Sequence, residues 1–159
     1  IEQKIALRPG VNMVAFHVDP GDVSPDSILG NHPAVTLVKN PDDEVYSTRF
    51  DIRDIHTWDA RLAYRVLAED SVEITLTGRP IEMQWVELAA GWNLVPFARS
   101  KPADVEGLLA LMPGVVLRVE DDRGNVYEPE GENVTLHSFE PGRAYRIYAA
   151  RAVRLDFPE

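Results

Sequence analysis

Two histidines, His56 and His137, stand 81 residues apart, and their imidazoles could serve as acid/base groups or as metal ligands. They open the matched quartets His56-Thr57-Trp58-Asp59 and His137-Ser138-Phe139-Glu140. The other histidines, His17 and His32, have no histidine at the matching position, and no His-x-x-x-His motif is present. We therefore interpret His56 and His137 as turn residues and expect no cofactor.

Two loop segments are rich in oxygen ligands of the kind that calcium prefers. They are Asn40-Pro41-Asp42-Asp43-Glu44 and Asp121-Asp122-Arg123-Gly124-Asn125. Neither fits the Asp-x-Asp-x-Asp-Gly calcium loop, and Arg123 places a positive charge inside the second segment. The favoured interpretation is a solvated hairpin tip, because these are common turn residues. Asp121 and Asp122 remain candidates for calcium ligands.

Aromatic side chains offer the clearest route to a ligand, because flat rings are rigid stacking platforms. We take Trp58, Trp85 and Tyr148 as candidate carbohydrate-stacking residues, with Arg65 and Arg146 as hydrogen-bond donors. For Trp85, packing between the two halves of the chain is the favoured alternative. Trp92 lies in an apolar segment, and we expect it in the core.

Signatures of catalysis are missing from the sequence. It contains no cysteine, no Gly-x-Ser-x-Gly elbow and no Ser-x-x-Lys motif. A pair of carboxylates for glycoside hydrolysis stays open, because such partners meet only through the fold. We expect a non-enzyme, with part of a polysaccharide-active enzyme as the third choice.

The elements that position these residues are set out by an internal repeat. Shifting the chain by 81 residues places Ile5–Gly78 on Val86–Glu159 without a gap. Fifteen positions are identical, among them Gly10/Gly91, Asn12/Asn93 and Tyr64/Tyr145. Such self-similarity predicts two homologous units, residues 1–80 and 81–159, that pack with internal pseudo-symmetry.

Each unit is expected to be mainly antiparallel sheet with one short helix, which gives an α+β fold. Helices are predicted near 25–30 and 102–112, where N-cap and Pro signals precede apolar residues. The segment 11–18 reads as a central strand, because apolar residues occupy both of its faces. Alternation over 63–76 predicts a hairpin.

Charge limits the range of partners. The net charge is −10, with 16 basic and 26 acidic side chains and no basic cluster, which disfavours nucleic acid and anionic membranes. No apolar run reaches the length of a membrane span. The first residue is Ile1 rather than Met, so we expect a piece of a longer protein.

The segment Gly91-Trp92-Asn93-Leu94-Val95-Pro96-Phe97 resembles a strand motif of tandem repeats in large secreted or surface proteins of bacteria. Gly124-Asn125-Val126-Tyr127 and Pro141-Gly142-Arg143-Ala144-Tyr145 are similar to later parts of those repeats, whereas the first unit has Val11 in place of Trp92. The resemblance implies an extracellular or cell-surface accessory module without catalytic residues. We expect it to bind polysaccharide; a structural spacer or a protein-interaction and adhesion repeat is the alternative.

Overall fold

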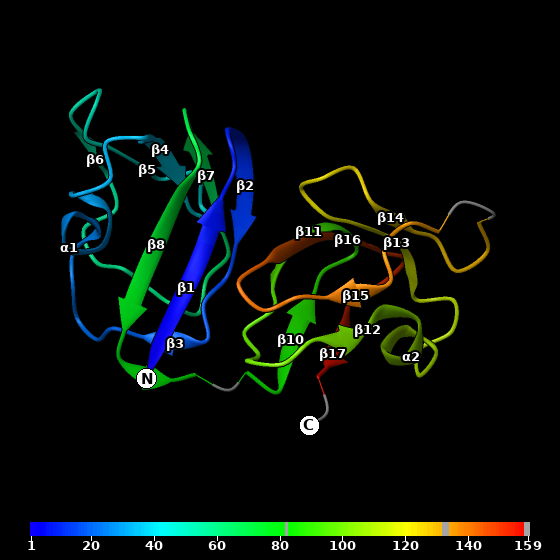
Figure 1. The fold of residues 1–159 in the computed structure, drawn as a ribbon. Coiled ribbons are helices and arrows are strands. Elements are labelled where there is room, and N and C mark those ends of the chain that lie inside the picture. The colour runs from blue at the N-terminus through cyan, green and yellow to red at the C-terminus, as the bar shows by residue number, and fades with distance from the viewer. Residues whose placement is uncertain (82, 132–133, 158–159) are drawn as a thin grey trace.

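Mainly antiparallel strands and two short helices build two lobes, seen side by side in the computed structural model (Figure 1). The structure describes residues 1–81, 83–131 and 134–157. In the first half (residues 1–80) the elements are β1 (Glu2–Leu7), β2 (Gly10–Val14), β3 (Val18–Asp19), α1 (Pro25–Leu29), β4 (Val35–Lys39), β5 (Val45–Ser47), β6 (Ile52–Arg53), β7 (Tyr64–Ala68), β8 (Val72–Thr77) and β9 (Arg79–Pro80). In the second half (residues 81–159) they are β10 (Trp85–Leu88), β11 (Gly91–Pro96), β12 (Ala103–Asp104), α2 (Val105–Leu109), β13 (Val116–Glu120), β14 (Val126–Tyr127), β15 (Ser138–Phe139), β16 (Ala144–Ala149) and β17 (Val153–Asp156). The expectation of a mainly antiparallel fold with few helices is confirmed.

Each half has a larger sheet and a two-stranded ribbon. The larger sheets have the strand orders β2-β7-β4-β5-β6 and β11-β16-β13-β14, and the ribbons are β1-β8 and β10-β17. Every pairing is antiparallel. In Figure 1 the ribbon β1-β8 lies in front of the larger sheet of its half, so the core is enclosed between two layers.

The hairpin predicted over residues 63–76 is wrong. Strand β7 pairs with β2 and β4, whereas β8 pairs with β1 in the other layer. Alternation places Tyr64 and Val66 on one side of the core and Ile74 and Leu76 on the other, and all four are buried. Because the apolar faces of β7 and β8 pack against each other across the core, the two strands lie in different layers, although the connection between them is short.

The assignment of residues 11–18 to a central strand is also wrong, because β2 lies at the edge of its sheet. One of its apolar residues, Val11, is 57% exposed. Apolar residues on both faces of a strand therefore do not mark a central position in this protein, and the same holds for the edge strand β11.

A Gly-x-Asn turn connects ribbon to sheet in each half. Gly10 and Gly91 have φ angles of 101° and 93°, a region that favours glycine. The amide of Asn12 donates to the carbonyls of Arg8, Gly10 and Val66, and its Oδ1 accepts from Arg8 N at 3.0 Å. Asn93 makes the same four kinds of contact within its own turn. These shared polar residues hold the fold rather than a ligand.

Both helices are short. Helix α1 occupies Pro25–Leu29, within the predicted segment, and Ser24 at its N-cap makes no capping hydrogen bond. Helix α2 occupies only Val105–Leu109, and its N-cap Asp104 accepts from Gly107 N at 2.6 Å. Neither described helix reaches the length and apolar content needed to cross a bilayer.

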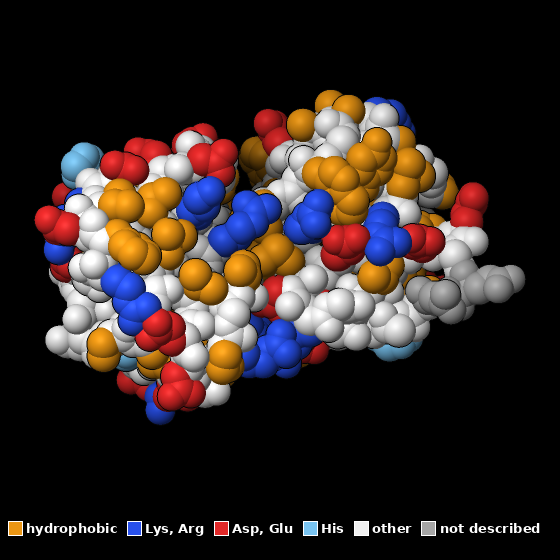
Figure 2. Space-filling view, turned by 90° about the horizontal axis from the view of Figure 1, so that it is seen from above, with side chains coloured by type: hydrophobic (Ala, Val, Ile, Leu, Met, Phe, Trp, Pro, Cys, Tyr) orange, Lys and Arg blue, Asp and Glu red, His pale blue; other side chains and the backbone are white. Residues whose placement is uncertain are grey.

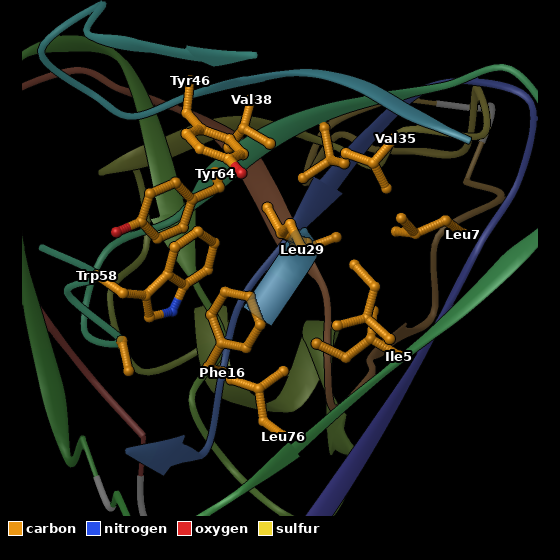
Figure 3. Close-up of a cluster of buried hydrophobic side chains, with 14 of the residues drawn as sticks. Ile5, Leu7, Phe16, Leu29, Val35, Val38, Tyr46, Trp58, Tyr64 and Leu76 are labelled. Carbon is orange, nitrogen blue, oxygen red and sulfur yellow. The ribbon is translucent and has the colours of Figure 1, made fainter. Parts of the chain in front are cut away.

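The core of the first half forms where ribbon, sheet and α1 meet (Figure 3). Leu29 of the helix points into it, as do Ile5 of the ribbon and Phe16. Trp58 and Tyr64 lie side by side in the same cluster. Burial of side chains of this size contributes about 1.5–3 kcal/mol each, so this cluster stabilises the first half substantially.

One buried tyrosine hydroxyl in each half makes the free energy of unfolding depend on pH in the alkaline range. Tyr64 and Tyr145 accept from the backbone amides of Asp59 and Glu140, and burial raises the pKa of each tyrosine to about 12. The unfolded chain loses these protons near pH 10, so the stabilising contribution is fully present below that pH and is lost as the pH rises towards 12. We expect urea midpoints to fall steeply between pH 10 and 12. Tyr64→Phe should flatten this fall, and an unchanged slope in that variant would contradict the assignment.

The two halves meet through small side chains. Met13, Ala15 and Ala63 of the first half form a buried cluster with Ala144 of the second. Ala15 N donates to the carbonyl of Gly142 at 3.2 Å, and Val14 forms a β-bridge with Arg143. The close approach of the backbones shows that the halves are in direct contact, and Arg79–Pro80 between them form strand β9, paired with β3.

Candidate functional site

The prediction that Trp58 is a ligand platform is wrong. Its side chain is only 3% exposed, and its ring stacks on Tyr64 with the ring centroids 4.1 Å apart. The ring of Phe16 packs against it edge-on at 5.1 Å (Figure 3). Trp58 is therefore a core residue of the first half.

The prediction that Trp92 is a core residue is wrong in the opposite direction, because 45% of this side chain is exposed. It lies on edge strand β11, where Val95 is buried and Trp92 points to the outer face of the sheet. Tyr148 of β16 lies directly opposite Trp92, and its side chain is 37% exposed. Two exposed aromatic rings thus occupy one sheet face.

These rings are held in contact by their neighbours. Trp92 and Tyr148 meet edge to face, with centroids 5.2 Å apart. The guanidinium of Arg146 lies 4.4 Å from the centroid of the Trp92 ring, a cation–π distance. Because Arg146 and Tyr148 both contact it, the Trp92 ring is fixed in orientation while much of it stays open to solvent.

Ion pairs surround the two rings. Arg118 lies opposite Tyr148 on β13 and pairs with Glu120 and Glu128, and Arg146 pairs with Glu120 at 3.3 Å. The pairs with Glu120 and Glu128 raise the pKa of Arg118. The rings are therefore bordered by charged donors and acceptors of balanced sign. We call the six residues Trp92, Leu94, Arg118, Glu120, Arg146 and Tyr148 the Trp92 face.

Figure 2 shows the molecule from above the upper sheets of Figure 1. Hydrophobic side chains gather on both lobes, with Lys and Arg side chains between them. On the second lobe, acidic and basic side chains lie beside the hydrophobic group, as the contacts of the Trp92 face require.

No family model matches the chain, and neither a curated protein nor a solved structure matches it.

Arg65 lies apart from the aromatic pair. It is on β7 of the first half, opposite Met13 and Lys39. The neighbouring row of that face holds Val11, Leu67 and Leu37 in place of Trp92, Tyr148 and Arg118. The first half thus presents apolar side chains, without a ring, at the positions where the second presents its aromatic residues.

Trp85 is exposed as well and does not join the halves. Its side chain is 45% exposed on the ribbon strand β10, and the guanidinium of Arg154 lies 5.4 Å from its ring centroid. Arg154 also pairs with Asp156 at 2.9 Å. The interpretation of Trp85 as packing between the halves is therefore wrong. Because the ribbon is the other layer of the second half, Trp85 does not belong to the Trp92 face.

The calcium candidates have other partners. Asp121 caps its own hairpin by accepting from Arg123 N and from both nitrogens of Asn125. Asp122 accepts from Met13 N at 2.8 Å and lies within 4.0 Å of the guanidinium of Arg143. Among the described residues, no group of three His, Cys, Asp or Glu side chains could hold a metal ion. The loop is a structural contact between the halves.

Asp122→Ala is expected to loosen that contact. The change leaves Met13 N and the half-buried Arg143 without their carboxylate partner, at a cost of about 1–3 kcal/mol. We expect the melting temperature to fall. We also expect the backbone amides of residues 13–15, at the contact between the halves, to exchange hydrogen faster. Asp156→Ala, at an exposed ribbon position, is the matched control. Equal behaviour of the two variants would show that the carboxylate contributes nothing at the junction.

The repeated histidines do not form a reactive site in the described residues. Both imidazoles are exposed, and neither makes a side-chain hydrogen bond within the part of the chain described. The carbonyl of His137 accepts from Val105 N at 3.0 Å, which fits a turn residue. His137 also borders a hollow of about 330 Å³ together with Asp121 and Glu140.

Proposed function

We propose that this protein is a non-catalytic accessory module that binds carbohydrate through the Trp92 face. The observation that carries the proposal is the exposed, oriented pair of Trp92 and Tyr148 with Arg146 against the indole. Most large aromatic side chains of the second half are buried, so two adjacent exposed rings call for a partner.

A sugar suits this surface for physical reasons. The C–H face of a pyranose can lie on an aromatic ring, which loses little entropy because its orientation is already fixed. Arg118, Glu120 and Arg146 supply donors and acceptors beside the rings, and hydroxyl groups can use both. An open sheet face, with strands about 4.8 Å apart, fits an extended polysaccharide better than a small enclosed ligand.

The scaffold would consist of two homologous units with internal pseudo-symmetry. In support, the sheet register Gly10↔Ala68 recurs as Gly91↔Ala149, and both sheets shift register at the matching position of β4 and β13. The resemblance to tandem repeats of secreted bacterial proteins supports an extracellular or cell-surface location as part of a larger chain. The net charge of −10 disfavours nucleic acid as a partner, and the lack of a long apolar run in the sequence disfavours membrane insertion.

A protein-interaction repeat is the second candidate, and one observation favours it. Val11 and Leu67 are exposed opposite each other on the first half's sheet. Exposed apolar patches favour association with other chains. Light scattering after size exclusion separates the two candidates, because an interaction surface predicts concentration-dependent dimers that Val11→Thr weakens.

The test is a panel of soluble and insoluble polysaccharides in affinity gels, read in parallel by tryptophan fluorescence. We expect retardation by at least one polysaccharide, together with a blue shift as the exposed indole of Trp92 leaves water. Absence of both signals across the panel would overturn carbohydrate binding and leave the interaction or spacer role.

A further inference from the structure

The outer edge of strand β11 is open, whereas the other edges of the two larger sheets are short or covered. Strands β6 and β14 form the far edges, and each is two residues long. The edge of β2 is covered by the second half, because Met13 N donates to Oδ2 of Asp122 at 2.8 Å. On the same edge, Ala15 N donates to the carbonyl of Gly142. Strand β11 has six residues and, in the described part of the chain, pairs with β16 alone.

The hydrogen-bonding groups on this open edge belong to Trp92 and Leu94. Backbone groups of an antiparallel strand point alternately towards and away from the neighbouring strand. Phe97 N donates to the carbonyl of Arg143 at 3.1 Å, so the odd-numbered residues of β11 face β16. The N–H and C=O groups of Trp92 and Leu94 therefore point away from β16, and they have no backbone partner among the described residues. Pro96 is next in this outward series and has no N–H to offer.

Strand β11 lacks the features that commonly prevent edge pairing. Natural edge strands are protected by charged side chains, by proline within the strand or by a covering segment. The segment Gly91–Pro96 contains no charged side chain, and its proline stands at the last position. An uncharged, open edge of this kind is a template for another extended strand.

We propose that a second copy of this chain pairs with β11 edge to edge, antiparallel, across a two-fold axis at Asn93. The edge is complementary to itself, because this register places Trp92 of each copy opposite Leu94 of the other and each N–H opposite a C=O. Both side chains lie on the outer face, where a ring and an aliphatic side chain form a favourable cross-strand pair. The Trp92 faces of both copies then lie on one side of a continuous sheet. The inference does not rest on carbohydrate binding.

The expected dimer is weak and depends on salt. The paired segment is short compared with a standard protein interface, so the dimer should form only at high protein concentration. Each copy carries a net charge of −10, and added salt screens the repulsion between the copies. Higher ionic strength should therefore favour association.

The test combines light scattering with amide hydrogen exchange on the wild-type protein, from micromolar to millimolar concentration and without polysaccharide. Exchange at the amides of Trp92 and Leu94 should slow as the concentration rises. Val11 holds the position on β2 that matches Trp92, and its amide is the internal control. Exchange at Val11 should not depend on concentration.

Leu94→Pro tests the interface directly. It removes a donor of the dimer from each copy but no donor of the sheet, because the N–H of Leu94 points away from β16. The matched control Leu94→Ala loses the same side-chain packing against the Met13 cluster and keeps the N–H. The dissociation constant of the dimer should be at least about ten-fold higher for Leu94→Pro than for Leu94→Ala, the effect of the lost hydrogen bonds.

Four results would overturn the proposal. They are a monomer at every concentration and ionic strength, equal dimerisation of Leu94→Pro and Leu94→Ala, a dimer that Val11→Thr disrupts, and protection of the Trp92 and Leu94 amides that is independent of concentration. The exchange measurement needs no variant, so a folding failure of Leu94→Pro leaves the test intact. Because no polysaccharide is present, failure of carbohydrate binding is distinguishable from failure of this proposal.

Discussion

Trp92→Ala is expected to weaken binding to any polysaccharide that retains the wild-type protein by roughly ten- to hundred-fold. Truncating an exposed aromatic anchor costs about 1.5–3 kcal/mol of binding energy, and each 1.4 kcal/mol is a factor of ten in the dissociation constant. The melting temperature should stay nearly unchanged, because the ring is 45% exposed and lies outside the buried core. Affinity gels measure the first quantity and thermal unfolding the second.

Two matched variants sharpen this test. Trp92→Phe keeps an aromatic surface beside Tyr148 and should retain part of the affinity. Trp85→Ala removes an equally exposed indole, also beside an arginine, from the ribbon layer and should bind like the wild type. If Trp85→Ala lost binding while Trp92→Ala kept it, the ligand would lie on the ribbon, and the Trp92 face would be wrong.

Arg146→Gln probes the electrostatic part of the same site. The guanidinium contacts the Trp92 ring and pairs with Glu120, so its loss frees the ring and removes one of the two arginine partners of Glu120. A smaller loss of affinity than for Trp92→Ala is the expected order. Arg65→Gln, at the matching position of the first half, is the control and should have no effect.

The sequence predicted the elements of this fold better than their pairing. Short-range residue preferences are enough to predict the turn glycines, the positions of both helices and the hairpin that joins β4 to β5. The choice of partner for β7 and β8 depends on which apolar faces meet across the core. Alternation in Tyr64–Ala68 and Val72–Thr77 is equally compatible with a hairpin and with two layers, so only the assembled fold decides.

The same limit explains why the sequence misplaces two tryptophans. Trp92 matches Val11 in the other half, and the shared apolar character suggests burial, but both positions lie on the outer face of an edge strand. Trp58 lies outside any strand, so no alternation reports its direction. A usable signal is present in the outward alternation of Tyr148. Its register partner across the sheet is Trp92, and that register is not readable from sequence.

Trp58→Ala should destabilise the protein severely. Replacing a buried tryptophan by alanine costs about 3–5 kcal/mol, because burial is lost and a cavity remains between Phe16 and Tyr64. At about 2–4 °C per kcal/mol for a chain of this size, the melting temperature should fall by roughly 6–20 °C. Calorimetry or denaturation followed by circular dichroism measures the change.

The second half supplies the control for this substitution. Phe139 stands at the position that matches Trp58 and packs against Tyr145, as Trp58 packs against Tyr64 in the first half. Nε1 of Trp58 is buried without a partner in the described residues, so Trp58→Phe sacrifices no hydrogen bond there. We expect Trp58→Phe to cost much less than Trp58→Ala. Equal losses would mean that the indole itself, and not the filled volume, stabilises the first core.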